Sequence, residues 1–192
     1  MKKATLDILD ADLSERFTHY TGHSAIDRAR FYKREFLYDP TRWPALYPLI
    51  SAHTFDWQEF RFGDVVASND LDVRIPSKNP GVYIFYVRPN DLLCKFPQFA
   101  LYVGISNVGG SKRPLRERLK DYFNLGQIKK RKNVHQLLQL YYDYVWVAFS
   151  LLSISSTKMM KLEEYIHDYL GPPFGRSGYS IEVKKSIAAW DL

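Results

Sequence analysis

Residues 81–87 read GVYIFYV and residues 100–105 read ALYVGI. Both stretches are rich in β-branched and aromatic residues, a composition typical of strands. The segment between them holds two prolines, an asparagine and an aspartate, which predict turns and a loop. We therefore expect two neighbouring strands that carry Tyr83 and Tyr102, with Gly81 and Gly104 as structural glycines beside them.

The residues after these strands predict a mixed domain. Pro114 fits the first turn of a helix to about Phe123, and Tyr144–Leu152 (YVWVAFSLL) is typical of a buried strand. The other expected elements are a helix over 133–140, a helix from Ser155 or Ser156 to Gly171, and a last short strand over 179–183. This order predicts an α/β (α+β) domain with a small, mainly antiparallel three-stranded sheet flanked by helices.

The first part of the chain has a different pattern. Residues 13–38 carry many charges and several aromatic side chains and predict one or two helices. Pro40, Pro44 and Pro48 are expected to break the chain, and residues 55–73 to form short strands or loops. We therefore divide the chain into an N-terminal extension, residues 1–75, which packs on a main domain, residues 76–192.

Composition limits the setting and the partners. The 192 residues suit one domain, and the net charge of +6 favours a polyanionic partner. The single cysteine, Cys94, excludes an internal disulfide and indicates a reduced, cytoplasmic location. Three aspartates within the first twelve residues argue against a signal peptide, and no apolar run approaches the roughly 20 residues that span a bilayer, so we expect no membrane partner.

Four segments together resemble the GIY-YIG nuclease family. They are GVY at 81–83, YVG at 102–104, the helix PLRERLKDYF at 114–123 and LEEYIHDYLGPPFGR at 162–176. Either tripeptide alone is a weak signal, but all four in order, with suitable secondary structure between them, are more specific. The resemblance covers residues 79–178 and implies hydrolysis of DNA phosphodiester bonds with Mg²⁺ or Mn²⁺.

Arg118 and Tyr122 are candidate site residues of the first of these helices. On a helical wheel Arg118 lies beside the apolar stripe centred on Leu119, and Tyr122, four residues on, shares that side. A guanidinium suits a non-bridging phosphate oxygen, and the resemblance maps the family's arginine onto Arg118. It also implies that Tyr122 assists the base. The alternative is a solvated basic helix face.

Glu163 is the candidate metal ligand. The apolar stripe of its helix places Glu163 at the border of the buried face, whereas Glu164 points away from it. A metal ligand must reach an enclosed cleft, so geometry and the family pattern both select Glu163. One carboxylate with water ligands suits Mg²⁺. The alternative is an ordinary surface carboxylate.

The resemblance gives the two strand tyrosines catalytic roles. Tyr83 would accept a proton from water, and Tyr102 would position water and phosphate. Because a free phenol has a pKa of about 10, such a base needs cationic neighbours such as Arg118 or a bound metal ion. Gly104 would let the backbone approach the substrate. The alternative is a pair of core tyrosines.

A basic segment predicts the nucleic-acid surface. Residues 112–132 hold nine basic and two acidic residues, a local charge of +7 against +6 for the whole chain. The alternative is a solubilising loop. Besides Arg118, the expected contacts to double-stranded DNA are Lys112, Arg113, Arg116, Lys129, Lys130, Arg131, Lys132 and, further on, Arg176.

One position departs from the family pattern. After the Pro172–Pro173 pair the family places an asparagine, but this chain has Gly175, which has no side-chain donor. We therefore expect a Mg²⁺-dependent DNA endonuclease, of restriction or mobile-element type by analogy. The alternatives are a catalytically weakened, nuclease-like DNA-binding module and a protein-interaction domain. Cutting both strands needs two visits or two subunits, for which a homodimer would serve.

Overall fold

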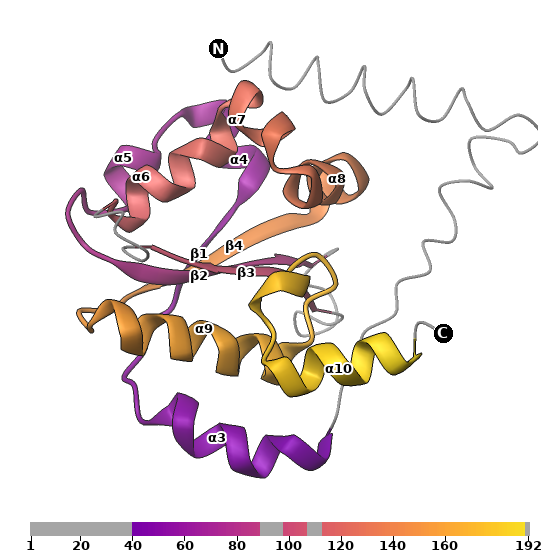
Figure 1. Ribbon diagram of the computed structural model, residues 1–192. Coiled ribbons are helices and arrows are strands. Elements are labelled where there is room, and N and C mark those ends of the chain that lie inside the picture. Colours follow the sequence, from indigo (N-terminus) through magenta and orange to yellow (C-terminus); the bar gives the residue numbers. More distant parts are fainter. Residues whose placement is uncertain (1–39, 89–97, 107–112, 191–192) are drawn as a thin grey trace, which may run out of the picture.

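The computed structural model describes residues 40–88, 98–106 and 113–190 of the chain (Figure 1). The helices expected over residues 13–38, and Cys94, lie outside these ranges. Within them, a four-stranded antiparallel sheet lies between two groups of helices. The predicted mixed α/β class is therefore confirmed.

The sheet has the strand order β1-β4-β2-β3. Its strands are β1 (Gln58–Arg61), β2 (Gly81–Val87), β3 (Phe99–Ile105) and β4 (Val145–Leu151). The expectation of three strands was wrong, because β1 pairs with β4 and forms a fourth strand. Its sequence, QEFR, carries two charges and one buried residue, Phe60, so it lacks the apolar alternation by which strands are recognised.

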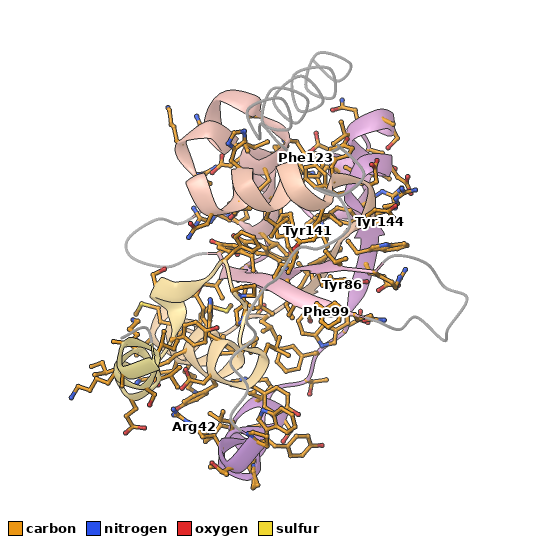
Figure 2. All side chains as sticks on the ribbon, turned by 90° about the vertical axis from the view of Figure 1, so that its right-hand side faces the viewer. Arg42, Tyr86, Phe99, Phe123, Tyr141 and Tyr144 are labelled. Carbon is orange, nitrogen blue, oxygen red and sulfur yellow. The ribbon has the colours of Figure 1, made fainter. Side chains whose placement is uncertain are left out.

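Helices α4 to α8 cover one face of the sheet, on the upper side in Figure 1. Phe123 and Tyr141 lie on this side in Figure 2 and pack against its core. That core contains alternate residues of β2, among them Tyr83 and Phe85. The elements of this layer are α4 (Phe62–Ser68), α5 (Leu71–Arg74), α6 (Leu115–Lys120), η2 (Asp121–Phe123), α7 (Leu125–Lys130), α8 (Lys132–Tyr141) and η3 (Tyr142–Tyr144).

Helix α9 (Ser156–Leu170) covers the opposite face, where Leu162 and Ile166 pack on Val82 and Val103. As predicted, Ser155 caps its start by accepting a hydrogen bond from the Lys158 amide at 3.4 Å. Gly171 ends it in the left-handed conformation, with φ 60°. The remaining elements on this side are η1 (Pro40–Arg42), α3 (Trp43–Ser51), η4 (Arg176–Gly178) and α10 (Ile181–Trp190).

Three local expectations were wrong. Residues 55–73 were expected to form short strands or loops, but Phe62–Ser68 and Leu71–Arg74 are the helices α4 and α5. Pro44 and Pro48 lie within α3, which packs against α9, rather than breaking the chain. Residues 179–183 do not form a strand, because Ile181 begins α10. Asp168 accepts a hydrogen bond from the Ser180 amide at 3.0 Å, and the Ser180 hydroxyl accepts one from the Val183 amide at 3.3 Å. These caps favour a helix start.

The segment after α9 closes the outer edge of β3. The Phe174 amide donates to the Leu101 carbonyl at 3.0 Å, and the Asn133 side chain donates to the Phe174 carbonyl at 3.0 Å. Phe174 is buried in the core of the α4–α8 side. This segment therefore connects the two helical layers around the β3 edge of the sheet.

Candidate active site

Three tyrosines from separate elements meet on the α4–α8 side of the sheet. Tyr83 lies on β2, Tyr102 on β3 and Tyr122 in η2, and their ring centroids are 5.8 to 6.4 Å apart. The hydroxyl oxygens of Tyr83 and Tyr122 are 2.6 Å apart and share a hydrogen bond. Tyr83 and Tyr122 are fully buried, whereas Tyr102 is partly exposed.

The two motif glycines make room for close contacts inside the protein. Gly104 faces Tyr83 across the β2–β3 pair, and a Cβ atom at Gly104 would overlap the Tyr83 phenol. A Cβ atom at Gly81 would overlap the Ser150 carbonyl oxygen and lie 3.0 Å from Leu115. Gly104 therefore makes room for the Tyr83 phenol, and this explains why a tyrosine and a glycine face each other here.

Arg118, on α6, interacts with all three phenols. Burial acts to lower the pKa of Arg118, but the interactions with Tyr83, Tyr122 and Tyr102 outweigh it and raise the pKa above its ordinary value. The Nε atom of Arg118 is buried and has no hydrogen-bond partner among the described residues. A buried donor without a partner is costly, so this guanidinium is suited to donate a hydrogen bond to an acceptor atom of a ligand.

Glu163 approaches the same cluster from α9, on the other side of the sheet. Because β3 is an edge strand, a side chain of α9 can reach past it to the face that carries the tyrosines. Burial raises the pKa of Glu163 to about 7, while the charge of Arg118 acts in the opposite direction. Its neighbour Glu164 instead pairs with Lys161 at 3.3 Å. Of the two glutamates, only Glu163 has interactions with this cluster among those described.

The surroundings of Tyr83 and Tyr102 favour the protonated form of these two phenols. Burial raises the pKa of Tyr83 and of Tyr102, and the neighbouring Tyr122 adds to both effects. Arg118 lowers both pKa values but does not overcome the burial, and the charge of Glu163 raises the pKa of Tyr102 further. Formation of a phenolate would therefore need positive charge beyond that of Arg118.

A second arginine contacts the cluster through Tyr122. Arg131, between α7 and α8, donates to the Tyr122 hydroxyl at 3.1 Å and to Asp121 at 2.6 Å. Its guanidinium carbon lies 4.9 Å from the centre of the Tyr122 ring. Arg113 binds both oxygens of Asp121, at 2.8 and 3.0 Å. These contacts could not be inferred from the sequence, which predicts instead that Arg113 and Arg131 bind nucleic acid.

Other members of the basic segment also have carboxylate partners. Asp72 of α5 forms ion pairs with Lys120 at 3.0 Å and with Arg116 at 3.5 Å. Lys130 is exposed. The local charge of +7 therefore overstates the charge available to a ligand, because it omits Asp72. Of the other expected contacts, Lys112 and the side chains of Lys129, Lys132 and Arg176 lie outside the described part of the structure.

A buried histidine occupies the space beside Gly175. The ring of His167 is enclosed by Gly175 and Gly178, and a Cβ atom at Gly175 would lie 2.5 Å from its Nε2 atom. Its Nδ1 atom is hydrogen-bonded to the Glu163 carbonyl at 2.8 Å, and burial lowers the pKa of His167. An asparagine at position 175 would not fit without movement of this ring. Sequence reasoning identified Gly175 but missed His167, which lies four residues after Glu163.

Comparisons with protein-family models, with curated proteins and with solved structures found no match to this chain. Within residues 40–88, 98–106 and 113–190, no three His, Cys, Asp or Glu side chains gather as a metal-binding group. No helix in these ranges has the length and apolar composition needed to cross a membrane. The site must therefore be interpreted from its own chemistry: two guanidiniums, three phenols and one carboxyl group.

Proposed function

We propose that this protein is a metal-dependent endonuclease that hydrolyses DNA phosphodiester bonds, with an active site of the GIY-YIG type. The observation that carries the proposal is the convergence of Tyr83, Tyr102, Tyr122, Arg118 and Glu163 from β2, β3, η2, α6 and α9. These residues are separated in the sequence by up to 80 positions. A cluster of this composition suits an anionic substrate whose charge grows during the reaction.

Each residue has a role that its surroundings support. Arg118 would bind a phosphate oxygen through donors that include the unpartnered Nε. Tyr83 would accept the proton of the attacking water, with the Tyr122 hydroxyl as its hydrogen-bond partner at 2.6 Å. Tyr102, the more exposed of the three phenols, would orient water and phosphate.

Glu163 fits a Mg²⁺ ion that keeps most of its water ligands. One carboxylate is too few for an all-protein cage, but Mg²⁺ commonly binds through one or two carboxylates together with water and phosphate oxygens. When bound, the ion would supply positive charge for the phosphate and for the phenolate form of Tyr83. Burial favours the protonated form of Glu163, so binding of the cation would require loss of that proton.

Cleavage of supercoiled plasmid DNA in Mg²⁺ or Mn²⁺ tests this proposal. We expect the wild type to nick or linearise the plasmid, and E163Q, R118K and Y83F to lose most of this activity. E164Q is the matched control, since Glu164 has the same chemistry but pairs with Lys161. Cleavage by E163Q at the wild-type rate would refute the role of Glu163. The substrate that we propose is double-stranded DNA, and the location that we propose for the protein is the cytoplasm.

Gly175 supports a second candidate, a nuclease-like module that binds DNA without cutting it. His167 fills the space in which the family's asparagine side chain would lie, so this chain lacks that donor. Salt-sensitive DNA binding by the wild type, with no cleavage in Mg²⁺ or Mn²⁺, would select this alternative.

If the protein does cut DNA, concerted cutting of both strands would need a homodimer, and sedimentation of the DNA complex would reveal one.

A further inference from the structure

The contacts of Arg131 are directed inward, toward the tyrosine cluster. Its Nη1 atom donates to the Tyr122 hydroxyl at 3.1 Å, and its Nη2 atom donates to Asp121 at 2.6 Å. The Arg131 side chain is only 24% exposed, and Asp121 is 14% exposed. Arg131 is therefore held by partners inside the protein, whereas a basic side chain that binds DNA phosphates is usually exposed and flexible.

Asp121 holds Arg131 in this position. Burial acts to raise the pKa of Asp121, but the hydrogen bonds and charge of Arg113, together with the charge of Arg131, outweigh it and keep the pKa below its ordinary value. Asp121 therefore stays ionised and binds both arginines. The stacking of the Arg131 guanidinium near the Tyr122 ring, at 4.9 Å, adds a second restraint.

The contact with Arg131 affects what the Tyr122 hydroxyl can do. A guanidinium only donates hydrogen bonds, so Tyr122 must accept from Arg131 with one of its two lone pairs. Acceptance from a cation polarises the hydroxyl and makes it a better donor to its next partner. That partner is the Tyr83 oxygen, 2.6 Å away. The arrangement therefore favours a chain in which Arg131 donates to Tyr122 and Tyr122 donates to Tyr83.

We propose that Arg131 is a positioning residue, which acts through Tyr122 to aim a polarised hydroxyl at Tyr83. This inference rests on the proposed function, in which Tyr83 accepts the proton of water. It assigns to Arg131 a task other than contact with DNA. A hydroxyl that donates to Tyr83 stabilises its phenolate, which is the form in which Tyr83 can accept a proton from water.

The test compares R131M, Y122F and the double variant in single-turnover cleavage of a DNA duplex at saturating protein. R131M should cut about ten- to a hundred-fold more slowly, a fraction of the effect of a whole general base. Its Kd for DNA and the salt dependence of that Kd should match the wild type. Because Arg131 acts through Tyr122, R131M should add little to the loss caused by Y122F. R74M is the matched control, because Arg74 also pairs with an aspartate, Asp70, and has no hydrogen bond or cation–π contact with a tyrosine among the described residues.

Each outcome has a distinct meaning. A cleavage rate unchanged in R131M, with a salt slope smaller by about 0.9, would make Arg131 a phosphate contact and overturn the inference. Losses that multiply in the double variant would overturn it as well. If R131M does not fold, R131K serves in its place, with and without Y122F, and should lose rate because one ammonium cannot reproduce the two-pronged contact. Absence of cleavage by the wild type would instead refute the proposed function itself.

Discussion

Replacement of Glu163 by glutamine should stabilise the folded protein at alkaline pH. Burial raises the pKa of Glu163 from 4.5 to about 7. At about 1.4 kcal/mol per pKa unit, this difference corresponds to about 3 kcal/mol. We expect about 2 kcal/mol, because solvent still reaches the partly exposed carboxyl group and screens its charge.

The direction of the pH dependence follows from proton binding. Between pH 4.5 and about 7 the folded state holds the Glu163 proton while the unfolded state has lost it, so the free energy of unfolding falls as the pH rises. The contribution is complete below 4.5 and lost above about 7. Glutamine does not titrate. As the pH rises from acid to alkaline, the wild type should therefore lose about 2 kcal/mol of unfolding free energy that E163Q keeps. This is a large share of a typical folding free energy.

Urea unfolding in EDTA, at about pH 5 and about pH 8, measures this change for both proteins. Taking the difference between wild type and variant cancels all other titrating groups. E164Q is the control and should differ from the wild type by less than about 1 kcal/mol. A stability difference between E163Q and wild type that is equal at the two pH values would refute the reasoning. Added Mg²⁺ at about pH 8 should then stabilise the wild type more than E163Q.

Three further substitutions test the packing and the charges around the site. G104A should destabilise the protein by about 1–3 kcal/mol in urea unfolding, because the new methyl group overlaps Tyr83; an unchanged midpoint would contradict this packing. G175N should also destabilise rather than restore activity, because its side chain meets His167, and cleavage faster than that of the wild type would argue otherwise. D72N should tighten DNA binding and steepen its salt dependence, since Asp72 neutralises two cations of the basic segment; unchanged binding, measured by fluorescence anisotropy, would show that these cations do not face DNA.

Much of the sheet could be predicted from local sequence because its inner strands are strongly apolar. Residues 81–87 and 145–151 are rich in β-branched and aromatic residues and lie in the middle of the sheet, where burial on both faces favours such a composition. β1 could not be predicted in this way. Glu59 points to the α9 side of the sheet and is paired with Arg88 at 2.9 Å, a contact with a residue 29 positions away. A charged strand residue whose partner is distant in the sequence has the same local pattern as a loop residue, so the sequence alone does not reveal the strand.

The same limit applies to the candidate site. Helical periodicity placed Arg118 and Glu163 beside their apolar stripes. In the structure Arg118 interacts with all three tyrosines, and Glu163 interacts with Tyr102. Arg131 could not be distinguished from its basic neighbours, because its contacts with Tyr122 depend on how η2, α7 and α8 turn. The space around Gly175 could not be foreseen either, since it is filled by His167 from another element. Periodicity determines which face a side chain occupies, but only packing determines its partner.

The geometry of the three tyrosines depends on a single apolar ring. Phe85 is fully buried and makes edge-to-face contacts with Tyr83, Tyr102 and Tyr122, at centroid distances of 6.0, 6.2 and 5.1 Å. Such contacts restrict the angles between the rings. The aromatic core thus does more than stabilise the fold: it orients the phenols toward the carboxyl and guanidinium groups with which they are proposed to act.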